Sequence, residues 1–275
     1  YGVDLIGAAV GCGSVIALLA VLDAPSAALV AGALAALAAA SFAHAARVRS
    51  RLAWGLAIGL AALGVINGSA RLPWLRPAWR KGSFEDLTGY MYTRWNSYSR
   101  VTVEPLQGPP ALWAVGERAP LEIMRPIEQR VVKIDGAAAT VMTRLGESPA
   151  QHTYLDWELT ALVHALRPNG AAAVIGVGGG RDVLAAVRAG HAPVLGLELN
   201  ALIVELLRAE MADFAGLSQL PAVKLVHEEA RSFLARDTGQ YSVITMSLID
   251  TWAATGAGAY SLSENGLYTV EAFST

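Results

Sequence analysis

The sequence predicts a mixed α/β protein in which N-terminal transmembrane helices lead, through a small antiparallel β unit, into a Rossmann-like domain. Three observations predict it. Residues 1–70 contain three long apolar stretches. Residues 94–150 form short alternating runs bounded by turn residues. From residue 151 onward, apolar strands alternate with helices, and a run of glycines follows the first strand. This last order is typical of a parallel sheet with crossover helices.

Composition limits the class of protein. Of the 275 residues, 54% are hydrophobic and 16% are charged, against roughly 25% charged in soluble domains. The net charge of −2 provides no basic field, so we expect no nucleic-acid partner. Cys12 is the only cysteine, which excludes a disulfide framework. The histidines do not fall at metal-ligand spacing, so we expect no metal site.

The apolar stretches are residues 3–22, 24–46 and 52–70. Each is close to the about 20 residues that cross a hydrocarbon core. They are apolar all round, unlike helices with a solvent face. We interpret them as about three transmembrane helices within residues 1–70, so the lipid membrane is an expected partner. Their many glycines and alanines favour close packing with one another, with other membrane subunits, or in a homo-oligomer.

Residues 71–93 predict a juxtamembrane linker with prolines and interfacial aromatic residues. The basic residues around the helices indicate conflicting membrane topologies. Arg47, Arg49 and Arg51 precede the third helix, whereas Arg76 and Arg80 follow it. Positive charge favours the cytoplasmic side, and both flanks of one spanning helix cannot lie there.

Residues 94–150 predict a small β-rich domain. The strand-like runs are residues 99–103, 111–115, 131–134 and 140–142. Asp135-Gly136 is a favoured turn pair for a two-residue hairpin. We expect this sheet to be a platform and not a catalytic site.

Residues 151–275 predict a Rossmann-like cofactor-binding domain that begins with a helix over residues 154–166. Further strands and helices then alternate, over residues 171–177, 182–189, 194–199, 201–215, 223–226 and 241–246. Gly176, Gly178, Gly179 and Gly180 lie between the first strand and the next helix. Glycines in this place let the backbone approach a nucleotide-type cofactor closely.

Acidic residues follow two of the predicted strands. Glu198 ends the second strand, at about the spacing where an acid binds ribose hydroxyls, and Glu229 follows the third strand. A dinucleotide is the obvious competitor. However, the third glycine of its pattern is missing, and Asp182 at the helix start would repel a pyrophosphate. An ammonium group of a methionine moiety would instead suit Asp182, which favours an S-adenosyl ligand.

Over residues 94–273 the chain resembles the spermidine synthase (polyamine aminopropyltransferase)-like family, specifically its membrane-embedded bacterial relatives. The opening Trp95-Asn96-Ser97-Tyr98-Ser99-Arg100-Val101 is similar to the start of the family's β-rich domain. The other matching segments are Ile134-Asp135-Gly136, Tyr154-Leu155-Asp156-Trp157-Glu158, Val174-Ile175-Gly176-Val177-Gly178-Gly179-Gly180, Glu229-Ala230-Arg231-Ser232-Phe233-Leu234 and the stretch from Tyr260 to Phe273.

The resemblance implies an S-adenosylmethionine-dependent transferase domain that uses S-adenosylmethionine or decarboxylated S-adenosylmethionine and a small-molecule acceptor, as in polyamine synthesis. It implies that Glu198 binds ribose and Glu229 adenine. Tyr154 and Tyr260 are expected to line the acceptor pocket. Because this cofactor is cytosolic, we expect a multi-pass protein of the cell inner membrane with its soluble domain in the cytoplasm.

Three positions depart from the family's pattern. Ser247 stands where the family has an acid that deprotonates the attacking amine, which leaves Asp250 as the expected catalytic acid or base. Arg181 stands at an aspartate position, and Asn200 replaces a further acid. Arg181 could pair with a carboxylate of a ligand, either of full S-adenosylmethionine or of an anionic acceptor.

Two functional hypotheses follow. The chain is either an aminopropyl- or methyltransferase, or a non-catalytic spermidine synthase-like subunit of a membrane protein complex. Ser247 favours the second, whereas the retained Glu198 and Glu229 favour the first. The predicted sheet also stops short of a complete doubly wound sheet, so we expect the domain to be truncated at its C-terminus.

Overall fold

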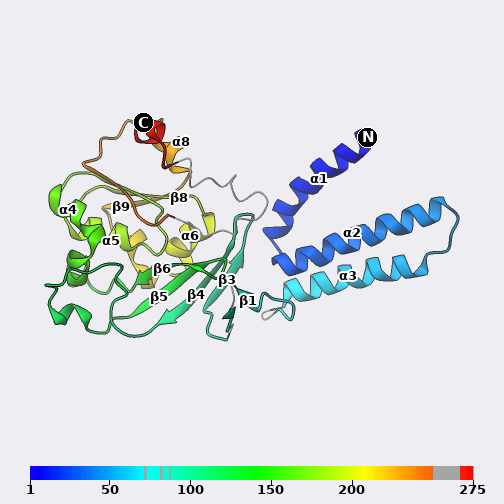
Figure 1. Cartoon of the computed structure of the whole chain (residues 1–275), viewed down its shortest axis with the longest axis horizontal. Coiled ribbons are helices and arrows are strands. Elements are labelled where there is room, and N and C mark those ends of the chain that lie inside the picture. The colour runs from blue at the N-terminus through cyan, green and yellow to red at the C-terminus, as the bar shows by residue number, and fades with distance from the viewer. Residues whose placement is uncertain (71–72, 81–82, 87, 250–266, 275) are drawn as a thin grey trace. The chain divides into compact units, whose positions relative to one another are not determined.

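The computed structural model describes residues 1–70, 73–80, 83–86, 88–249 and 267–274 (Figure 1). Its contacts divide the chain into two compact units. The first unit comprises residues 1–88 and 94–100, and the second comprises residues 89–93 and 101–275. Each unit is described by itself.

The first unit begins with three long helices, α1 (Gly2–Leu19), α2 (Ala24–Ala45) and α3 (Arg51–Ser69). Their mean hydropathies are 1.9, 1.9 and 1.6, and by length and composition each could cross a membrane. The three predicted apolar helices are therefore confirmed as helices. Asp23 begins α2 by accepting a hydrogen bond from the backbone N–H of Ser26, as an N-cap side chain does.

Helices α2 and α3 lie side by side as an antiparallel pair (Figure 1). Gly64 and Gly68 of α3 permit this approach, because a Cβ atom on Gly64 would lie 3.1 Å from the Ser26 carbonyl oxygen. The buried Asn67 amide donates to Ser26 Oγ at 2.9 Å and to the Leu75 carbonyl, and accepts from the Leu75 N–H. A buried polar side chain thus finds its partners inside the pair.

The first unit also holds a two-stranded antiparallel ribbon, β1 (Trp79–Arg80) with β2 (Ser83–Phe84). A four-stranded sheet, most of which belongs to the second unit, has the order β3-β4-β5-β6. Its strands are β3 (Tyr92–Trp95), β4 (Arg100–Leu106), β5 (Gln129–Ile134) and β6 (Ala138–Thr143). The turn between β5 and β6 uses Asp135 and Gly136 at φ of +49° and +74°, so the predicted hairpin is confirmed.

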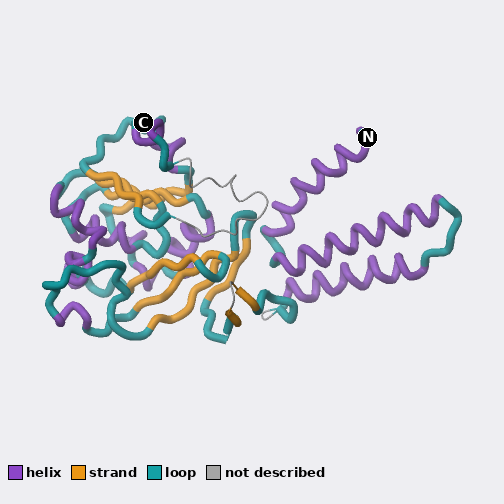
Figure 2. The backbone as a smooth tube through the Cα atoms, viewed as in Figure 1, coloured by secondary structure: helices purple, strands orange, loops and turns teal. Residues whose placement is uncertain are grey.

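A second sheet is wholly parallel and has the order β10-β7-β8-β9 (orange strands in Figure 2). Its strands are β7 (Ala172–Ile175), β8 (Val194–Glu198), β9 (Val223–His227) and β10 (Val243–Met246). In chain order this is 3-2-1-4, the first part of the doubly wound arrangement. The topological switch point therefore lies between β7 and β10.

Helices precede, connect and follow these strands. They are α4 (Leu162–Leu166), α5 (Arg181–Arg188), α6 (Ala201–Glu205), a π-helical turn (Leu206–Glu210), α7 (Ala212–Ala215), α8 (Ala230–Leu234) and α9 (Val270–Phe273). Short 3₁₀ turns lie at Leu121–Met124, Pro149–Gln151, Thr153–Trp157, Leu159–Ala161 and Leu217–Gln219. The helix predicted over residues 201–215 is thus interrupted by the π-helical turn.

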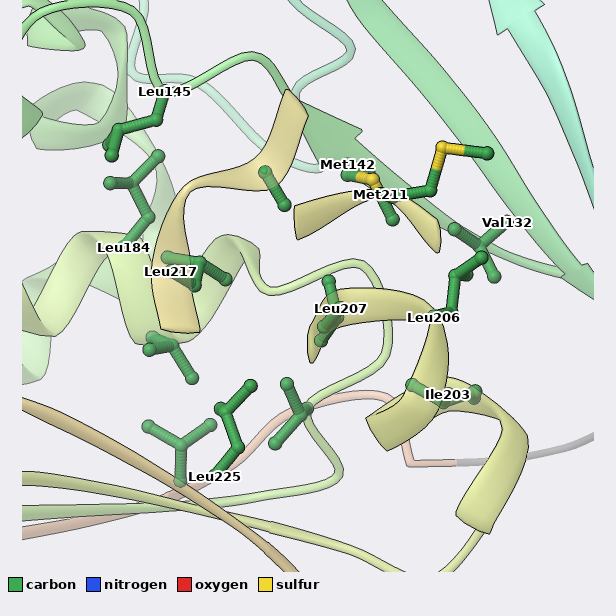
Figure 3. Packing of buried hydrophobic residues seen from close by; sticks show 14 of the residues in the cluster. Val132, Met142, Leu145, Leu184, Ile203, Leu206, Leu207, Met211, Leu217 and Leu225 are labelled. Atoms are coloured by element: carbon green, nitrogen blue, oxygen red, sulfur yellow. The ribbon is translucent and has the colours of Figure 1, made fainter. Parts of the chain in front are cut away.

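One hydrophobic core is shared by both four-stranded sheets. Figure 3 shows Val132 and Met142 of the antiparallel sheet packed with Leu206 and Met211, from the crossover after β8. Met142 and Leu206 are fully buried. Burial of this apolar surface holds the antiparallel sheet to the helical layer of the parallel sheet.

Two local predictions are wrong. Residues 111–115 form no strand, and only Val115 makes an isolated bridge, to Glu158. The helix expected over residues 154–166 is broken at Glu158, whose backbone is extended at φ −85° and ψ 145°. The bridge to Val115 explains the break, because a residue that pairs with another segment leaves the helical hydrogen-bond pattern. Only residues 162–166 are α-helical.

We expect Met142→Ala to lower the free energy of unfolding of the second unit by about 2–5 kcal/mol, because it leaves a cavity in the shared core. Leu121→Ala is the control, since Leu121 is 86% exposed and should change that energy by less than about 0.5 kcal/mol. Urea unfolding of the detergent-solubilised chain, followed by tryptophan fluorescence, measures both. Equal effects of the two substitutions would contradict the described core.

Candidate active site at the carboxyl edge of the parallel sheet

The carboxyl ends of the parallel strands bring the predicted site residues to one edge. β7 runs into the glycine loop, residues 176–180, and β8 ends at Glu198. β9 is followed by Glu229, and β10 by Ser247. Ligands of doubly wound sheets bind at this edge, next to the switch point. Asp250 and Tyr260 lie outside the described residues.

The glycine loop has a backbone that other residues rarely adopt. Gly176, Gly178 and Gly180 have φ of +76°, +51° and +88°. Gly180 is also the N-cap of α5, so the loop delivers the chain directly to the helix start. Glycine is required at these three positions because a Cβ atom disfavours positive φ.

Gly179 is required for a different reason. A Cβ atom there would lie 2.3 Å from the carbonyl oxygen of Val141, in strand β6. The Gly179 N–H also donates to Thr140 Oγ1 at 3.2 Å. The glycine loop therefore packs against β6, and Gly179 permits that contact.

The backbone donors of the loop are already used within the chain. The N–H of Gly176 donates to the Leu197 carbonyl at 2.9 Å, and that of Gly180 to the Val177 carbonyl at 2.8 Å. The N–H of Gly178 donates to Glu198 Oε2 at 3.0 Å. In this conformation the loop differs from phosphate-binding loops, whose N–H groups point toward the anion.

The Glu198 carboxylate joins the ends of the two central strands. Oε2 accepts from Gly178, after β7, and Oε1 accepts from the N–H of Asn200 at 2.9 Å, after β8. Burial raises the pKa of Glu198, and these backbone hydrogen bonds counteract part of that rise. Asn200 in turn caps α6 through its side chain, which accepts from the Leu202 N–H.

Arg181, the first residue after the loop, forms an ion pair with Glu158. Arg181 Nη1 lies 2.9 Å from Glu158 Oε1 and also donates to the Ala111 carbonyl at 3.1 Å. Glu158 Oε1 accepts from the Trp113 N–H at 2.8 Å. The Arg181 charge is thus paired with an internal carboxylate. Burial raises the pKa of Glu158, although Arg181 favours its charged form.

Ser247, which follows β10, donates its hydroxyl hydrogen to Asp182 Oδ2. This bond joins the exit of β10 to the first turn of α5, across the switch point between β7 and β10. Asp182 is half-buried and also disfavours the charged form of Glu158. A carboxylate therefore lies beside the serine, contributed by the neighbouring helix.

Glu229 is exposed and begins α8, accepting from the N–H groups of Arg231 and Ser232 at 2.9 and 2.7 Å. Burial alone would raise the pKa of Glu229, but its hydrogen bonds from Ser232 and Arg231 outweigh that effect and lower it. Glu229 is thus a helix cap in this structure. Its expected contact with adenine stays a prediction.

Tyr154 lies in the shared core and is 4% exposed. Its hydroxyl is hydrogen-bonded to Thr143 Oγ1 at 2.9 Å. Burial raises the pKa of Tyr154, and Thr143 partly offsets this. The charges of Glu158 and Arg181 act on the same hydroxyl, so Tyr154 lies close to the ion pair.

The sequence did not predict the contacts that three residues of the site make. Glu158 was named only within a segment that resembles the family, Asp182 only for its charge toward a ligand, and Thr140 only as part of a strand. The available signals were an acidic residue before an apolar segment and another in the first turn after the glycines. Their partners are distant in sequence, so the pattern alone could not pair them.

The histidines gather no metal site in the part of the chain that the structure describes, where no group of three or more potential ligands occurs. His164 and His191 are both buried and pack edge to face, with ring centroids 5.0 Å apart. Burial lowers the pKa of His164, and His191 adds to this effect. They form a buried packing contact.

Comparisons with known proteins give distant likenesses only. No family model matches the sequence, and no curated protein does. A spermidine synthase solved with the transition state analogue AdoDATO is similar at a TM-score of 0.37 and 15% identity, over 62% of this chain and 56% of that one. The spermidine synthase from Thermotoga maritima gives the same TM-score and identity, over 62% and 55%.

This chain therefore spans little more than half the length of these two enzymes. At this identity and TM-score the likeness is too distant to support a statement about substrate or activity.

We expect Gly179→Ala to destabilise the second unit by about 1–3 kcal/mol, because the added methyl group would push the loop away from β6. Gly116→Ala is the matched control, since a Cβ atom on Gly116 meets nothing within 4 Å. Thermal unfolding of the purified chain measures both. A Gly179→Ala protein as stable as the control would refute the close contact.

Glu198→Gln and Glu229→Gln should change the pH dependence of stability in opposite directions. The raised pKa of Glu198 means that wild-type stability falls as pH rises from its ordinary pKa of 4.5 toward the raised value. Glu198→Gln should therefore gain stability relative to wild type across that interval. The lowered pKa of Glu229 stabilises the wild type above pH 4.5, and this is lost as pH falls through the lowered value.

Denaturant unfolding of both variants between pH 3.5 and about pH 7 tests these opposite slopes. Parallel curves for the two variants would show that neither carboxyl is perturbed as described.

Proposed function

We propose that this chain is a membrane-anchored, spermidine synthase-like transferase that uses S-adenosylmethionine or decarboxylated S-adenosylmethionine. The observation that carries the proposal is the position of Glu198. Its carboxylate ends β8 directly beside the glycine loop that follows β7. An acid at this place in a doubly wound sheet accepts hydrogen bonds from ribose hydroxyls. A carboxylate oxygen accepts more than one hydrogen bond, so Glu198 can hold the loop and a ribose together.

The charges around the loop favour a cationic ligand over a dinucleotide. The N–H groups of Gly176, Gly178 and Gly180 donate hydrogen bonds within the chain, so they are not available as donors to a diphosphate. Among the described residues, the carboxylates of Glu198, Glu158 and Asp182 lie around the loop and the start of α5, together with the positive charge of Arg181. A sulfonium ion suits an acidic site of this kind, whereas a diphosphate would be repelled.

A bound S-adenosyl compound supplies an electrophilic carbon attached to a positively charged sulfur. We assign the adenine to Glu229, and the acceptor pocket to Tyr154 and Tyr260. An amine acceptor must lose a proton before it attacks, which requires a carboxylate in reach. Asp250 is the residue we assign to this role, because Ser247 cannot act as a base unaided.

We propose further that α1, α2 and α3 anchor the protein in the cell inner membrane as a multi-pass protein. The cofactor is cytosolic, so the transferase unit belongs on the cytoplasmic side. The small residues of these helices favour contact with other membrane subunits or a second copy of the chain.

A second candidate is a non-catalytic subunit of a membrane complex that retains the fold and the cofactor site. The bond from Ser247 to Asp182 favours it, because a hydroxyl there replaces the acid of the usual position and ties up a neighbouring carboxylate. This subunit would bind an S-adenosyl compound without transferring any group.

Isothermal titration of the full chain in lipid nanodiscs tests the proposal. S-adenosylmethionine, its decarboxylated form, 5′-methylthioadenosine and NADH are titrated in parallel. We expect S-adenosyl compounds to bind and NADH not to bind. Glu198→Ala should weaken S-adenosyl binding at least tenfold, whereas Glu147→Gln, an exposed carboxylate of the same unit, should not.

Mass spectrometry of amine and methyl acceptors then separates the two candidates. Group transfer supports the transferase, and binding without transfer supports the non-catalytic subunit. Failure of every S-adenosyl compound to bind, with the chain folded, would refute both.

A further inference from the structure

In the ion pair between Arg181 and Glu158, the two carboxylate oxygens of Glu158 differ in their hydrogen bonding. Glu158 Oε1 receives Arg181 Nη1 and the Trp113 N–H. Glu158 Oε2 is buried and has no hydrogen-bond partner within the described segments. The Glu158 side chain is only 1% exposed, and that of Arg181 is 16% exposed. A buried carboxylate thus keeps one oxygen without a donor.

This arrangement is poor as a purely structural contact. Arginine and carboxylate side chains commonly meet through two parallel hydrogen bonds, which would satisfy both oxygens. An unpartnered oxygen of a buried carboxylate is costly, because burial removes its water without replacing it. The geometry is that of a carboxylate prepared for a second, cationic donor.

The pair lies at the cofactor loop. Arg181 directly follows Gly180 and opens α5, whose N-terminus favours negative charge. The next residue, Asp182, acts electrostatically on Glu158, so the two carboxylates are close. A ligand group next to the loop would therefore lie near a guanidinium and near a buried carboxylate that has one unsatisfied oxygen.

We propose that Arg181 and Glu158 form a binding site for an α-amino acid zwitterion, with Arg181 taking the carboxylate and Glu158 Oε2 the ammonium. This inference rests on the proposed function, and it selects full S-adenosylmethionine over the decarboxylated form. Oε2 is closed to solvent, so the ammonium reaches it as Arg181 turns from Glu158 toward the ligand carboxylate.

Selectivity follows from this exchange of partners. A zwitterion replaces one internal ion pair by two pairs with the ligand, so both buried charges remain compensated. A ligand with only an ammonium group displaces Arg181 from Glu158 and offers the guanidinium nothing. A buried charge without a partner is strongly unfavourable. The internal pair therefore weakens the binding of decarboxylated S-adenosylmethionine relative to that of S-adenosylmethionine.

The test is calorimetric titration of the full chain in nanodiscs with three ligands. Besides its sulfonium, S-adenosylmethionine carries the carboxylate and the ammonium, and the decarboxylated form carries the ammonium but no carboxylate; 5′-methylthioadenosine, a neutral thioether, carries none of these groups. We expect the wild type to bind S-adenosylmethionine at least tenfold more tightly than the decarboxylated form. Equal affinity of the wild type for these two ligands would overturn the inference, and this comparison needs no variant.

Variants assign the charges. Arg181→Gln and Glu158→Gln should each weaken S-adenosylmethionine at least tenfold and leave 5′-methylthioadenosine within twofold. Arg188→Gln is the matched control: Arg188 lies on the same helix α5 and pairs with Asp156 at 2.5 Å, and its loss should leave all three affinities within twofold. Loss of 5′-methylthioadenosine binding as large as that of S-adenosylmethionine would overturn the zwitterion site.

Failure of the two proposals can be distinguished. If wild-type protein binds 5′-methylthioadenosine but does not prefer S-adenosylmethionine, only the zwitterion site fails. If no adenosyl ligand binds to folded wild-type protein, the proposed function fails as well. If Arg181→Gln does not fold, Arg181→Lys replaces it, because lysine keeps the positive charge. In Arg181→Lys the logarithm of the affinity ratio of S-adenosylmethionine to its decarboxylated form should stay above half of the wild-type value.

Discussion

The Glu198 carboxylate holds the ends of the two central strands in place, and the geometry of the site depends on it. It accepts one backbone N–H from Gly178, after β7, and one from Asn200, after β8. Gly178 belongs to a loop with three glycines at positive φ, and Asn200 caps the next helix. A single buried acid thus fixes the loop before α5 and the start of α6. The cost of burying its charge is partly offset by the backbone donors that surround it.

Local pattern predicted much of the fold. The three apolar helices were predicted because uniform hydrophobicity over about 20 residues is a local property. The Asp135-Gly136 turn was predicted because both residues tolerate positive φ, which the structure uses. The break at Glu158 was not predicted, since it depends on pairing with Val115. Residues 111–115 likewise alternate as a strand does, but no neighbouring strand in the described part of the chain pairs with them.

The carboxyl ends of parallel strands lie at one edge of a sheet, so chain order alone places the glycine loop, Glu198, Glu229 and Ser247 along that edge. Their roles in binding stay predictions. The side-chain partners were not predictable in this way. Arg181 meets Glu158, and Ser247 meets Asp182, across gaps in the sequence that only the folded sheet closes. The contacts of Glu229 and Tyr154 with a ligand stay predictions.

The contact between Gly179 and β6 also constrains how the sequence can vary. Thr140, which accepts from the Gly179 N–H, pairs with Val132 across the hairpin. One residue inserted into or deleted from the three-residue turn, residues 135–137, would shift this register and turn Thr140 to the opposite face of the sheet. The length of this hairpin is therefore under the same constraint as the glycines. Among natural homologues, we expect insertions in the connection between β4 and β5 and a fixed length in the turn between β5 and β6.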